Sequence, residues 1–404
     1  MLCLNQNHRL SIYFEVNRYT NISILLKVVI LQGLSSRNVS VIGAGTAGLI
    51  AARELAQAGI STTVYDQKRV LGYPVRASGI VSINGLRSIG VDYKSAVTNT
   101  LYGARLHAGK STIEIDAKSP MAHVVERMRF NELCREQAEK AGAGVVLGRR
   151  ITPELLSGIR SKGDITVGAD GAVSTVAKHY NMGELGDHVL TYKAEYEVES
   201  SRPDTVDLFF DKEYKGLFGW LCPNSRSVLE VGIGVSPGRY NARRAFESFV
   251  RRHEIKDMVE GRKMLDGQAS IIPMRLRRRI VDLGNRVLLV GDAAGQVKPS
   301  TGGGIVFGGN AAVIAAKTIR RHLLHGTSLR EYEKFYKKRY GPDTALHFLV
   351  NRLYSGMGGR GAEFGIRAMR FMGLSSLLGR YGDMDSPTRL IANVAMRRRA
   401  RVDY

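Results

Sequence analysis

The stretch NVSVIGAGTAGLIAARELAQAGISTTVYD (38–66) decides the fold of this chain. An apolar run leads into a glycine turn, a helix-like segment and a second apolar run that ends at Asp66. This order predicts strand, tight turn, helix and strand, the context in which a Gly-x-Gly-x-x-Gly pattern binds a dinucleotide. Gly43 then permits the turn, Gly45 lets a pyrophosphate approach the backbone, and Gly48 lets the helix pack on the strand. Asp66 is placed to accept hydrogen bonds from ribose hydroxyls.

A second glycine-rich stretch, GDAAGQVKPSTGGGI (291–305), also lies between a predicted strand and a predicted helix. The strand is RVLLV (286–290), and the helix covers 304–323. A helix N-terminus attracts anions, so this turn is a candidate for one side of a ligand site. The alternative is a glycine-rich turn that binds nothing.

Two further polar positions lie between these stretches. Arg127 comes just before a helix that we expect to start near Asn131, where a guanidinium can reach a phosphate or ribityl oxygen. The alternative is a solvated arginine at a helix start. Asp170 follows a predicted strand in a Gly-Ala-Asp-Gly sequence, and Ser174 is expected to open the next helix.

The order of these four motifs resembles the FAD-dependent oxidoreductases of the p-hydroxybenzoate hydroxylase superfamily, over roughly residues 38–323. The resemblance implies tightly bound, non-covalent FAD. It also implies that Asp292 binds the ribityl chain, and that the glycine-rich turn passes beside the isoalloxazine ring. The cofactor-binding residues implied by the motifs are Gly43, Gly45, Gly48, Asp66, Arg127, Asp170, Asp292, Pro299, Gly302, Gly303 and Gly304.

Within the predicted substrate region, FGWLCPNSRSVLEVGIG (218–234) resembles a signature of geranylgeranyl reductases, especially the archaeal enzymes that saturate isoprenoid lipid chains. The matching positions, which we take as catalytic-site candidates, are Phe218, Trp220, Pro223, Gly232 and Gly234. An aromatic wall suits a long apolar polyene, and the proline and glycines are expected to shape a narrow tunnel. The alternative is that the only tryptophan of the chain is a core residue packed between two sheets.

Three positions depart from that family's pattern. Phe218 stands where the family usually has Tyr, and Cys222 where it usually has Phe. In GYPVRASGIVS (72–82), Ala77 replaces a cysteine expected near the flavin, so we add Ser78 as a candidate substitute.

The resemblance implies hydride transfer from reduced FAD to one alkene carbon and proton transfer to the other. No second Gly-x-Gly-x-x-Gly fingerprint between a strand and a helix appears, so no dedicated nicotinamide domain is expected, and NAD(P)H or a ferredoxin-like protein is expected to reduce FAD transiently. Two other functions stay open: a flavin monooxygenase or halogenase of the same superfamily, and a prenyl-binding protein without redox activity.

The composition favours an anionic partner. The 404 residues carry a formal net charge of +22, and the pI is near 10.0. No nucleic-acid-binding signature appears. The resemblance to geranylgeranyl reductases implies that the anionic partner is a geranylgeranylated phospholipid or geranylgeranyl diphosphate, and we expect peripheral contact with an anionic membrane. The three cysteines form neither a disulfide framework nor a metal motif, which favours the reducing cytoplasm and predicts no metal site.

The predicted fold class is α/β, with a discontinuous Rossmann-like FAD-binding domain, an inserted antiparallel β-sheet substrate domain and a C-terminal helical segment. Strands are expected at 192–199 and 226–235. The domain boundaries are: 1–37, an extension outside the fold, whose apolar patch is too short to span a bilayer; 38–72, 121–180 and 280–325, FAD binding; 73–120 and 181–279, substrate binding; 326–404, helical and basic.

The C-terminal segment is predicted to be helical, with a break near Gly341–Pro342. Residues 362–380 combine apolar residues with arginines, and MRRRARVDY closes the chain. An apolar helix flanked by arginines can rest on an anionic membrane. The alternative is a helix that completes the core of the substrate domain.

Overall fold

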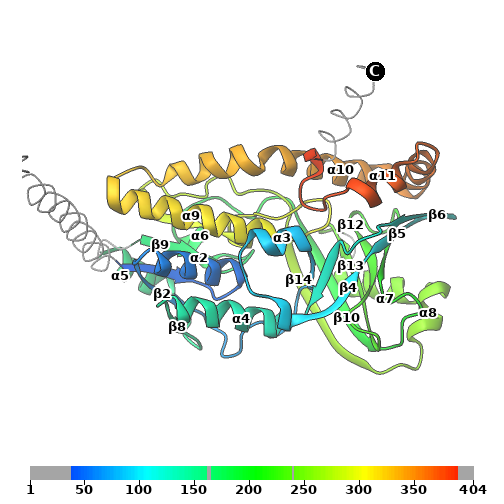
Figure 1. The fold of residues 1–404 in the computed structure, drawn as a ribbon, viewed down its shortest axis with the longest axis horizontal. Helices are drawn as coiled ribbons and strands as arrows, with labels where there is room; N and C mark the ends of the chain where they lie inside the picture. Colours follow the sequence, from blue (N-terminus) through cyan, green and yellow to red (C-terminus); the bar gives the residue numbers. More distant parts are fainter. Residues whose placement is uncertain (1–37, 162–164, 239–240, 390–404) are drawn as a thin grey trace, which may run out of the picture.

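The computed structural model describes residues 38–161, 165–238 and 241–389 (Figure 1). The predicted extension, residues 1–37, and the closing arginine-rich residues 390–404 lie outside the described residues. The described part contains three sheets and a set of helices, two of them long.

The first sheet is fully parallel and has five strands in the order β15-β9-β1-β2-β8. The helices α2 (Thr46–Gln57), α4 (Arg127–Lys140) and α9 (Ile305–His325) belong to this half of the molecule, and α2 packs against both of the others. The strands are β1 (Asn38–Ile42), β2 (Ser61–Tyr65), β8 (Gly144–Val146), β9 (Ile165–Gly168) and β15 (Val287–Leu289).

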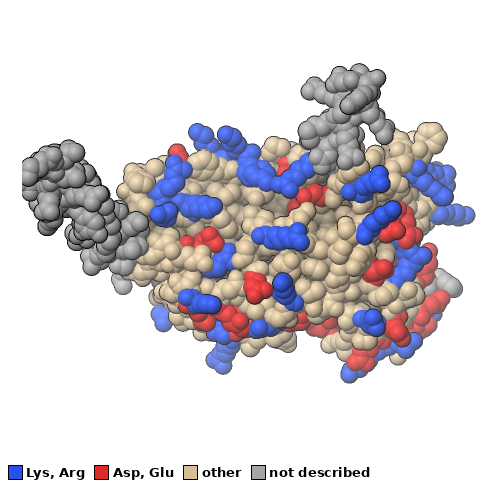
Figure 2. All heavy atoms as spheres, in the orientation of Figure 1, with Lys and Arg blue, Asp and Glu red and all other residues tan. Residues whose placement is uncertain are grey.

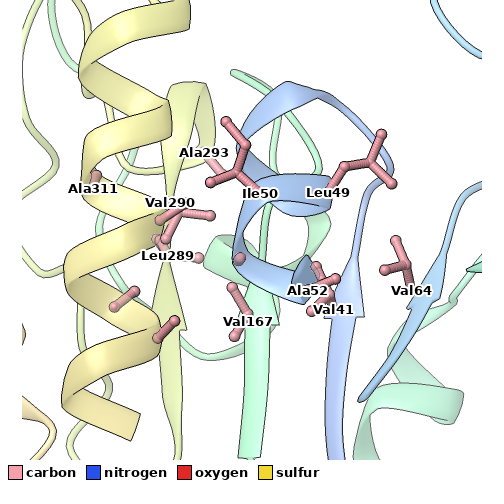
Figure 3. Close-up of a cluster of buried hydrophobic side chains, with 14 of the residues drawn as sticks. Val41, Leu49, Ile50, Ala52, Val64, Val167, Leu289, Val290, Ala293 and Ala311 are labelled. Atoms are coloured by element: carbon pink, nitrogen blue, oxygen red, sulfur yellow. The ribbon is translucent and has the colours of Figure 1, made fainter. Parts of the chain in front are cut away.

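The core of this half forms where α2 and α9 lie on the sheet (Figure 3). Val41, Val167 and Leu289 come from three neighbouring strands and are fully buried. Ile50 of α2 and Ala311 of α9 lie against them. Each large aliphatic side chain buried here contributes about 1.5–3 kcal/mol.

The second sheet has seven strands in the order β14-β10-β13-β12-β11-β5-β6. All pairs are antiparallel except β5 with β11. The helices α7 (Ala242–Val250) and α8 (His253–Val259) contribute to an apolar core on one face of this sheet. The strands are β5 (Gly103–Ala108), β6 (Ser111–Asp116), β10 (His188–Glu197), β11 (Thr205–Phe210), β12 (Gly216–Pro223), β13 (Val228–Val235) and β14 (Met264–Pro273).

A small third sheet joins segments predicted for different domains. It has the order β3-β7-β4, and both pairs are antiparallel. Its strands are β3 (Ile80–Ser82), β4 (Val97–Leu101) and β7 (Ala122–Val125). The short helices are α3 (Ile83–Ser88), α5 (Pro153–Ser161), α6 (Thr175–His179), η1 (Lys94–Ala96) and η2 (Gly291–Ala293).

The C-terminal region corrects two expectations. The helix α10 (Arg330–Phe371) runs through Pro342 without the predicted break. Proline removes one backbone donor, but the turn before it is held by Tyr336 and Tyr340, which pack on the main core. The predicted helix at 362–380 is divided by Gly373, which has a positive φ of 65° and precedes α11 (Leu374–Tyr381).

The predicted fold class is confirmed, with a five-stranded parallel sheet, an inserted and mainly antiparallel sheet, and a helical C-terminal region. None of the helices in the described residues is long and apolar enough to span a bilayer.

Candidate functional site

The glycine turn after β1 has the three properties that the sequence pattern predicts. Gly43 has a φ of 110°, and a Cβ there would overlap the carbonyl group of Ala169. A Cβ on Gly48 would overlap the carbonyl oxygen of Gly43, so the helix crosses the turn at backbone contact. Gly45 differs, because no atom of the described residues lies within 4 Å of its added Cβ. The backbone is therefore open at the one position where a pyrophosphate is expected to approach it.

Asp66 fastens this turn to the end of β2. One carboxylate oxygen accepts from the backbone N–H of Ala44 at 2.7 Å, and the other accepts from the N–H of Lys68 at 2.8 Å. These bonds fix the carboxylate beside the turn. Its contact with a ribose stays a prediction.

Arg127 is the first residue of α4, four residues earlier than the predicted start near Asn131. Glu126 precedes the helix, and its carboxylate accepts hydrogen bonds from two backbone N–H groups of the first turn. An acidic N-cap was not recognised in the sequence, although Asp and Glu suit helix N-termini. The guanidinium Nη2 donates to Thr46 Oγ1 at 3.3 Å, whereas Nη1 is buried without a hydrogen-bond partner in the described part of the chain.

Asp292 and Arg127 influence each other electrostatically. Burial raises the pKa of Asp292 from 3.8 to about 6, and the guanidinium of Arg127 partly opposes this rise. Burial also lowers the pKa of Arg127, although Asp292 acts in the opposite direction. Two partly buried charges with an unsatisfied donor are costly unless a ligand completes their hydrogen bonds. Phosphate and ribityl oxygens would satisfy the guanidinium, and a ribityl hydroxyl would satisfy the carboxylate, so these residues fit FAD.

Asp170 stabilises the turn that follows β9. Its Oδ1 accepts from the Ser174 hydroxyl at 2.6 Å, and its Oδ2 accepts from the N–H of Val176 at 3.1 Å. Ser174 in turn caps α6, as expected. Burial raises the pKa of Asp170 against these hydrogen bonds. The structure thus gives Asp170 a role in shaping the loop, while direct contact with FAD stays a prediction.

Sequence reasoning missed Arg277, which links three loops of the FAD-binding half. Its guanidinium donates to the carbonyl oxygens of Ala293 at 2.6 Å, Ala172 at 2.7 Å and Gly183 at 2.8 Å. Only 6% of Arg277 is exposed. Its position within the basic run 275–279 gave no signal that this arginine is internal.

The turn before α9 lies between the two halves of the molecule. Gly302 has a φ of 73°, and its added Cβ would come within 3.0 Å of Ile272 on β14. Gly304 caps α9, and its added Cβ would lie 2.8 Å from Asp292 Oδ1. The turn therefore has the Asp292 carboxylate on one side and the seven-stranded sheet on the other.

Pro299 and Gly303 belong to the same turn, and their neighbours hold it closed. The N–H of Lys298 donates to the carbonyl of Gly303 at 3.0 Å. The Ser300 hydroxyl is hydrogen-bonded to His347 Nδ1 of α10 at 2.8 Å. The turn before α9 (residues 298–304), called the second glycine turn below, is thus attached to α10. The sequence contained no signal for this contact.

A second attachment comes from the C-terminal end of the described chain. The Lys298 ammonium lies 2.9 Å from Asp385, which also accepts a hydrogen bond from Ser82. Although burial opposes it, Lys298 and Ser82 hold the pKa of Asp385 below its usual value. Burial, with a contribution from Lys298, lowers the pKa of His347 to about 4, so this imidazole is neutral at physiological pH.

The predicted aromatic wall lies on β12. Phe218 and Trp220 make an edge contact with ring centroids 6.4 Å apart. Phe210 of β11 extends this cluster, 5.5 Å from Phe218, and Tyr354 of α10 lies 5.1 Å from Phe210. Pro223 ends the strand, where its carbonyl accepts a hydrogen bond from a side-chain amide. The wall therefore combines strand residues with the same helix that holds the second glycine turn.

The two signature glycines are explained by packing on β13. A Cβ on Gly232 would overlap the Trp220 ring, which covers this position from the neighbouring strand. A Cβ on Gly234 would crowd the Leu217 side chain. Both glycines thus let β12 side chains lie directly on the sheet. Whether this surface lines a tunnel stays a prediction.

A buried charge network fixes Trp220, and it was missed in the sequence. Trp220 Nε1 donates to Glu230 at 2.8 Å, and the other Glu230 oxygen accepts from Lys193 at 2.7 Å. Lys193 also donates to Glu195 at 3.1 Å. Glu230 is fully buried, and Lys193 is 4% exposed. The signal was present, since an acid inside the apolar strand VLEVGIGV requires a partner.

Ser78 lies in a loop anchored beside Arg127. A Cβ on Gly72 would crowd the first residues of α4, and one on Gly79 would overlap the carbonyl of Val125. Ala77 is exposed and Ser78 is half-buried between these anchors. The loop is near the cofactor residues in the fold, but a catalytic contact of Ser78 stays a prediction.

Comparison with known proteins identifies the family. A family model described as FAD binding domain matches residues 36–328. The chain belongs to this family. It is therefore an FAD-dependent oxidoreductase, and the predicted cofactor is confirmed.

Curated relatives confirm the resemblance to geranylgeranyl reductases. A digeranylgeranylglycerophospholipid reductase of Methanothrix thermoacetophila is 28% identical over 350 residues, covering 78% of this chain and 87% of that protein. Digeranylgeranylglycerophospholipid reductase 2 of Methanothermobacter thermautotrophicus is 27% identical over 368 residues, covering 84% and 93%.

Solved structures support the fold. A geranylgeranyl bacteriochlorophyll reductase-like protein of Thermoplasma acidophilum has a TM-score of 0.72 at 19% identity, covering 89% of this chain and 96% of that one. A flavin-dependent brominase has a TM-score of 0.65 at 17% identity, covering 90% and 99%. The same architecture thus occurs in proteins described as reductase-like and as halogenases.

Proposed function

We propose that this protein uses FAD to saturate carbon–carbon double bonds of geranylgeranyl chains in isoprenoid membrane lipids, on the cytoplasmic side of the membrane. The observation that carries the proposal is the aromatic wall of Phe218 and Trp220. This wall lies on the sheet that also contacts the second glycine turn, before α9, through Ile272. The names of the curated relatives support the same substrate class.

Reduced FAD, when bound, supplies the hydride. The protein supplies position and an environment poor in water. The wall would hold an apolar chain by contact, and Tyr354 joins this wall to the second glycine turn, since its hydroxyl donates to the Ser300 carbonyl at 3.0 Å. An isolated alkene accepts hydride poorly, so correct placement must lower much of the barrier. A wall fixed by both β12 and α10 is suited to that task.

The proposed substrate enters as a geranylgeranylated phospholipid or as geranylgeranyl diphosphate, both of which are anionic and suit the net charge of +22. The proposed electron donor is external: NAD(P)H or a ferredoxin-like protein that reduces FAD transiently. Mixing the anaerobic holoprotein with each donor and following the loss of oxidised-flavin absorbance identifies which one acts.

The deciding experiment starts from chemically reduced holoprotein under anaerobic conditions. Geranylgeranyl diphosphate or digeranylgeranylglycerophospholipid is added, flavin reoxidation is followed, and the product is analysed by mass spectrometry. We expect reoxidation without oxygen and a product heavier by one hydrogen molecule for each double bond reduced. A Trp220→Ala variant should retain FAD and lose most turnover of the long chain, because it removes the wall and not the cofactor residues.

The experiment also separates the competing functions. Reoxidation that requires O₂ and yields an oxygenated or halogenated product would identify a monooxygenase or halogenase, functions that the brominase neighbour makes relevant. Binding of the lipid without any flavin reoxidation would identify a prenyl-binding protein. Among the described residues, Arg127 Nη1 has no hydrogen-bond partner, and burial raises the pKa of Asp292. Both features suit a resident cofactor and therefore favour a redox enzyme over a prenyl-binding protein.

A further inference from the structure

The second half of α10 carries an exposed apolar stripe. Leu349 is 53% exposed, Leu353 48%, Phe364 72% and Phe371 94%. These positions are separated by four, eleven and seven residues. An α-helix returns to the same side at such intervals, so the four side chains lie along one face of the helix.

The opposite face of α10 is already packed on the protein. His347 and Tyr354 hold the second glycine turn, and Asn351 donates to the Gly216 carbonyl at 2.8 Å. Further along, Ala362 and Ile366 are buried in a core cluster with β5 and β6. The exposed stripe is therefore a second apolar face, and packing of α10 within the described chain does not require it.

Arginines are interleaved with this stripe. Arg360 and Arg367 share its face by helical spacing, and Arg352 and Arg370 lie along one edge. From residue 345 to residue 380 the sequence has five arginines and one acid, Glu363, which pairs with Arg367 at 2.7 Å. In Figure 2, basic side chains predominate along the edge of the molecule where Figure 1 places α10.

We propose that this stripe docks on an anionic lipid surface, with Phe364 and Phe371 inserted at the headgroup boundary and the arginines bound to lipid phosphates. Exposed aromatic residues with arginines on one helix face suit this environment. A second copy of the chain suits it less, because a two-fold interface would set the same arginine-rich face against itself.

The position of α10 gives this docking a consequence for the proposed reductase. The helix contacts lipid with one face, and its other face supplies Tyr354 to the aromatic wall and His347 to the second glycine turn. A geranylgeranyl chain leaving the bilayer beside α10 would therefore reach the site around a single helix. This consequence rests on the proposed function, whereas the docking surface itself does not.

The test is co-sedimentation of the full-length holoprotein with vesicles of phosphatidylcholine, with and without phosphatidylglycerol. We expect binding to the anionic vesicles that weakens as salt is raised. Phe364→Ser with Phe371→Ser should weaken it at least about tenfold, since two apolar anchors are lost. Arg360→Gln with Arg370→Gln should also weaken it and reduce its salt dependence.

Matched controls use residues of the same kinds elsewhere on the surface. Met264→Ser with Leu283→Ser removes two exposed apolar side chains, and Arg243→Gln with Arg244→Gln removes two exposed arginines of α7. Neither control should change vesicle binding, and flavin content should be the same in every variant.

Three results would overturn the proposal. The phenylalanine variant could bind vesicles as well as the unaltered protein, or the controls could weaken binding equally. Alternatively, analytical ultracentrifugation could show a dimer that the phenylalanine variant dissociates, with no vesicle binding, which would assign the stripe to a second copy. Vesicle binding needs no turnover. An inactive protein that binds vesicles therefore refutes the reductase alone, and an active one that does not bind refutes the docking surface alone.

Discussion

Each half of the molecule holds two opposite charges that are at least partly buried and influence each other, and the halves differ in how completely the hydrogen bonds of these charges are satisfied. In the seven-stranded sheet, Lys193 and Glu230 are buried, and both Glu230 oxygens have short hydrogen-bond partners. In the FAD-binding half, Arg127 Nη1 has no hydrogen-bond partner among the described residues, and burial raises the pKa of Asp292 to about 6.

This difference indicates that Lys193 and Glu230 have a structural role, whereas Arg127 and Asp292 form part of a site that needs a ligand. A complete buried network fixes one arrangement of side chains, and losing one member leaves the others uncompensated. Where the protein leaves hydrogen-bonding groups unsatisfied, those groups are available to bind a ligand. Substitutions of Lys193 or Glu230 should therefore affect the stability of the fold most. Substitutions of Arg127 or Asp292 should affect the affinity for FAD most.

Glu230→Ala should have the largest effect. Among the described residues, the change leaves Lys193 with Glu195 as its one remaining partner, and it removes the acceptor of the Trp220 N–H. We expect a loss of about 3–5 kcal/mol in the free energy of unfolding, the usual cost of breaking a buried ion pair. Urea denaturation of the apoprotein measures it.

The matched control replaces both charges, as Lys193→Met with Glu230→Leu. Removing both partners should recover much of the stability lost by the single change, because no charge remains buried alone. FAD affinity of the folded fraction should stay unchanged in both variants. A single variant as stable as the unaltered protein would show that the network contributes nothing.

Arg127→Met should have the next largest effect, and on binding instead of folding. A charge-assisted hydrogen bond contributes about 1.5–3 kcal/mol, so FAD should bind roughly ten- to hundredfold more weakly. The apoprotein should be at least as stable as before, since the change removes a poorly satisfied guanidinium. Fluorescence titration of apoprotein with FAD measures the affinity, and loss of apoprotein stability with unchanged affinity would reverse the assignment.

The sequence was sufficient where a residue type is demanded by local backbone geometry. Gly43, Gly48 and Gly302 stand where a side chain would meet neighbouring atoms, and their spacing within strand–turn–helix units made them recognisable. The strands β10 and β13 were predicted because their apolar residues recur along short runs bounded by polar ones.

The sequence was insufficient where partners are distant in the chain. The bond between Lys298 and Asp385 spans 87 residues, and that between Ser82 and Asp385 spans 303. The spacing of residues along the sequence does not predict such contacts, because only the assembled fold brings these residues together. The prediction of a helix break at Pro342 was wrong for the opposite reason. Proline is a local signal for a break, but the packing of the neighbouring tyrosines on the core outweighed it.

Asp292→Asn tests the incomplete pair through its pH dependence. The pKa of Asp292 is raised above 3.8 in the folded apoprotein, so the unfolded chain releases its proton first. Stability attributable to this group therefore falls as pH rises from about 4 to about 6. The variant should lack this fall and be more stable than the unaltered apoprotein at pH 7 by about 1–2 kcal/mol, since one pKa unit corresponds to about 1.4 kcal/mol and the half-buried carboxylate keeps some hydration.

Denaturation of both apoproteins across this pH range measures the difference. The same variant should bind FAD more weakly, so that stability and cofactor binding change in opposite directions. Parallel pH profiles for the two apoproteins would refute the raised pKa.

Gly45→Ala should produce the smallest change in stability, and it separates cofactor space from packing space within one turn. Gly45 has φ −74° and ψ 172°, which alanine adopts without strain, and within the part of the chain that the structure describes no atom lies within 4 Å of the added methyl group. The apoprotein should gain about 0.4–1 kcal/mol, because alanine has less freedom to lose on folding. FAD binding should nevertheless weaken, since the methyl group would occupy the space through which a pyrophosphate approaches the backbone.

Gly48→Ala is the control: its methyl group would overlap the Gly43 carbonyl, so that variant should lose stability whether or not FAD is present. If Gly45→Ala and Gly48→Ala destabilised the apoprotein equally, the open space at Gly45 would not be a cofactor site held ready by the fold.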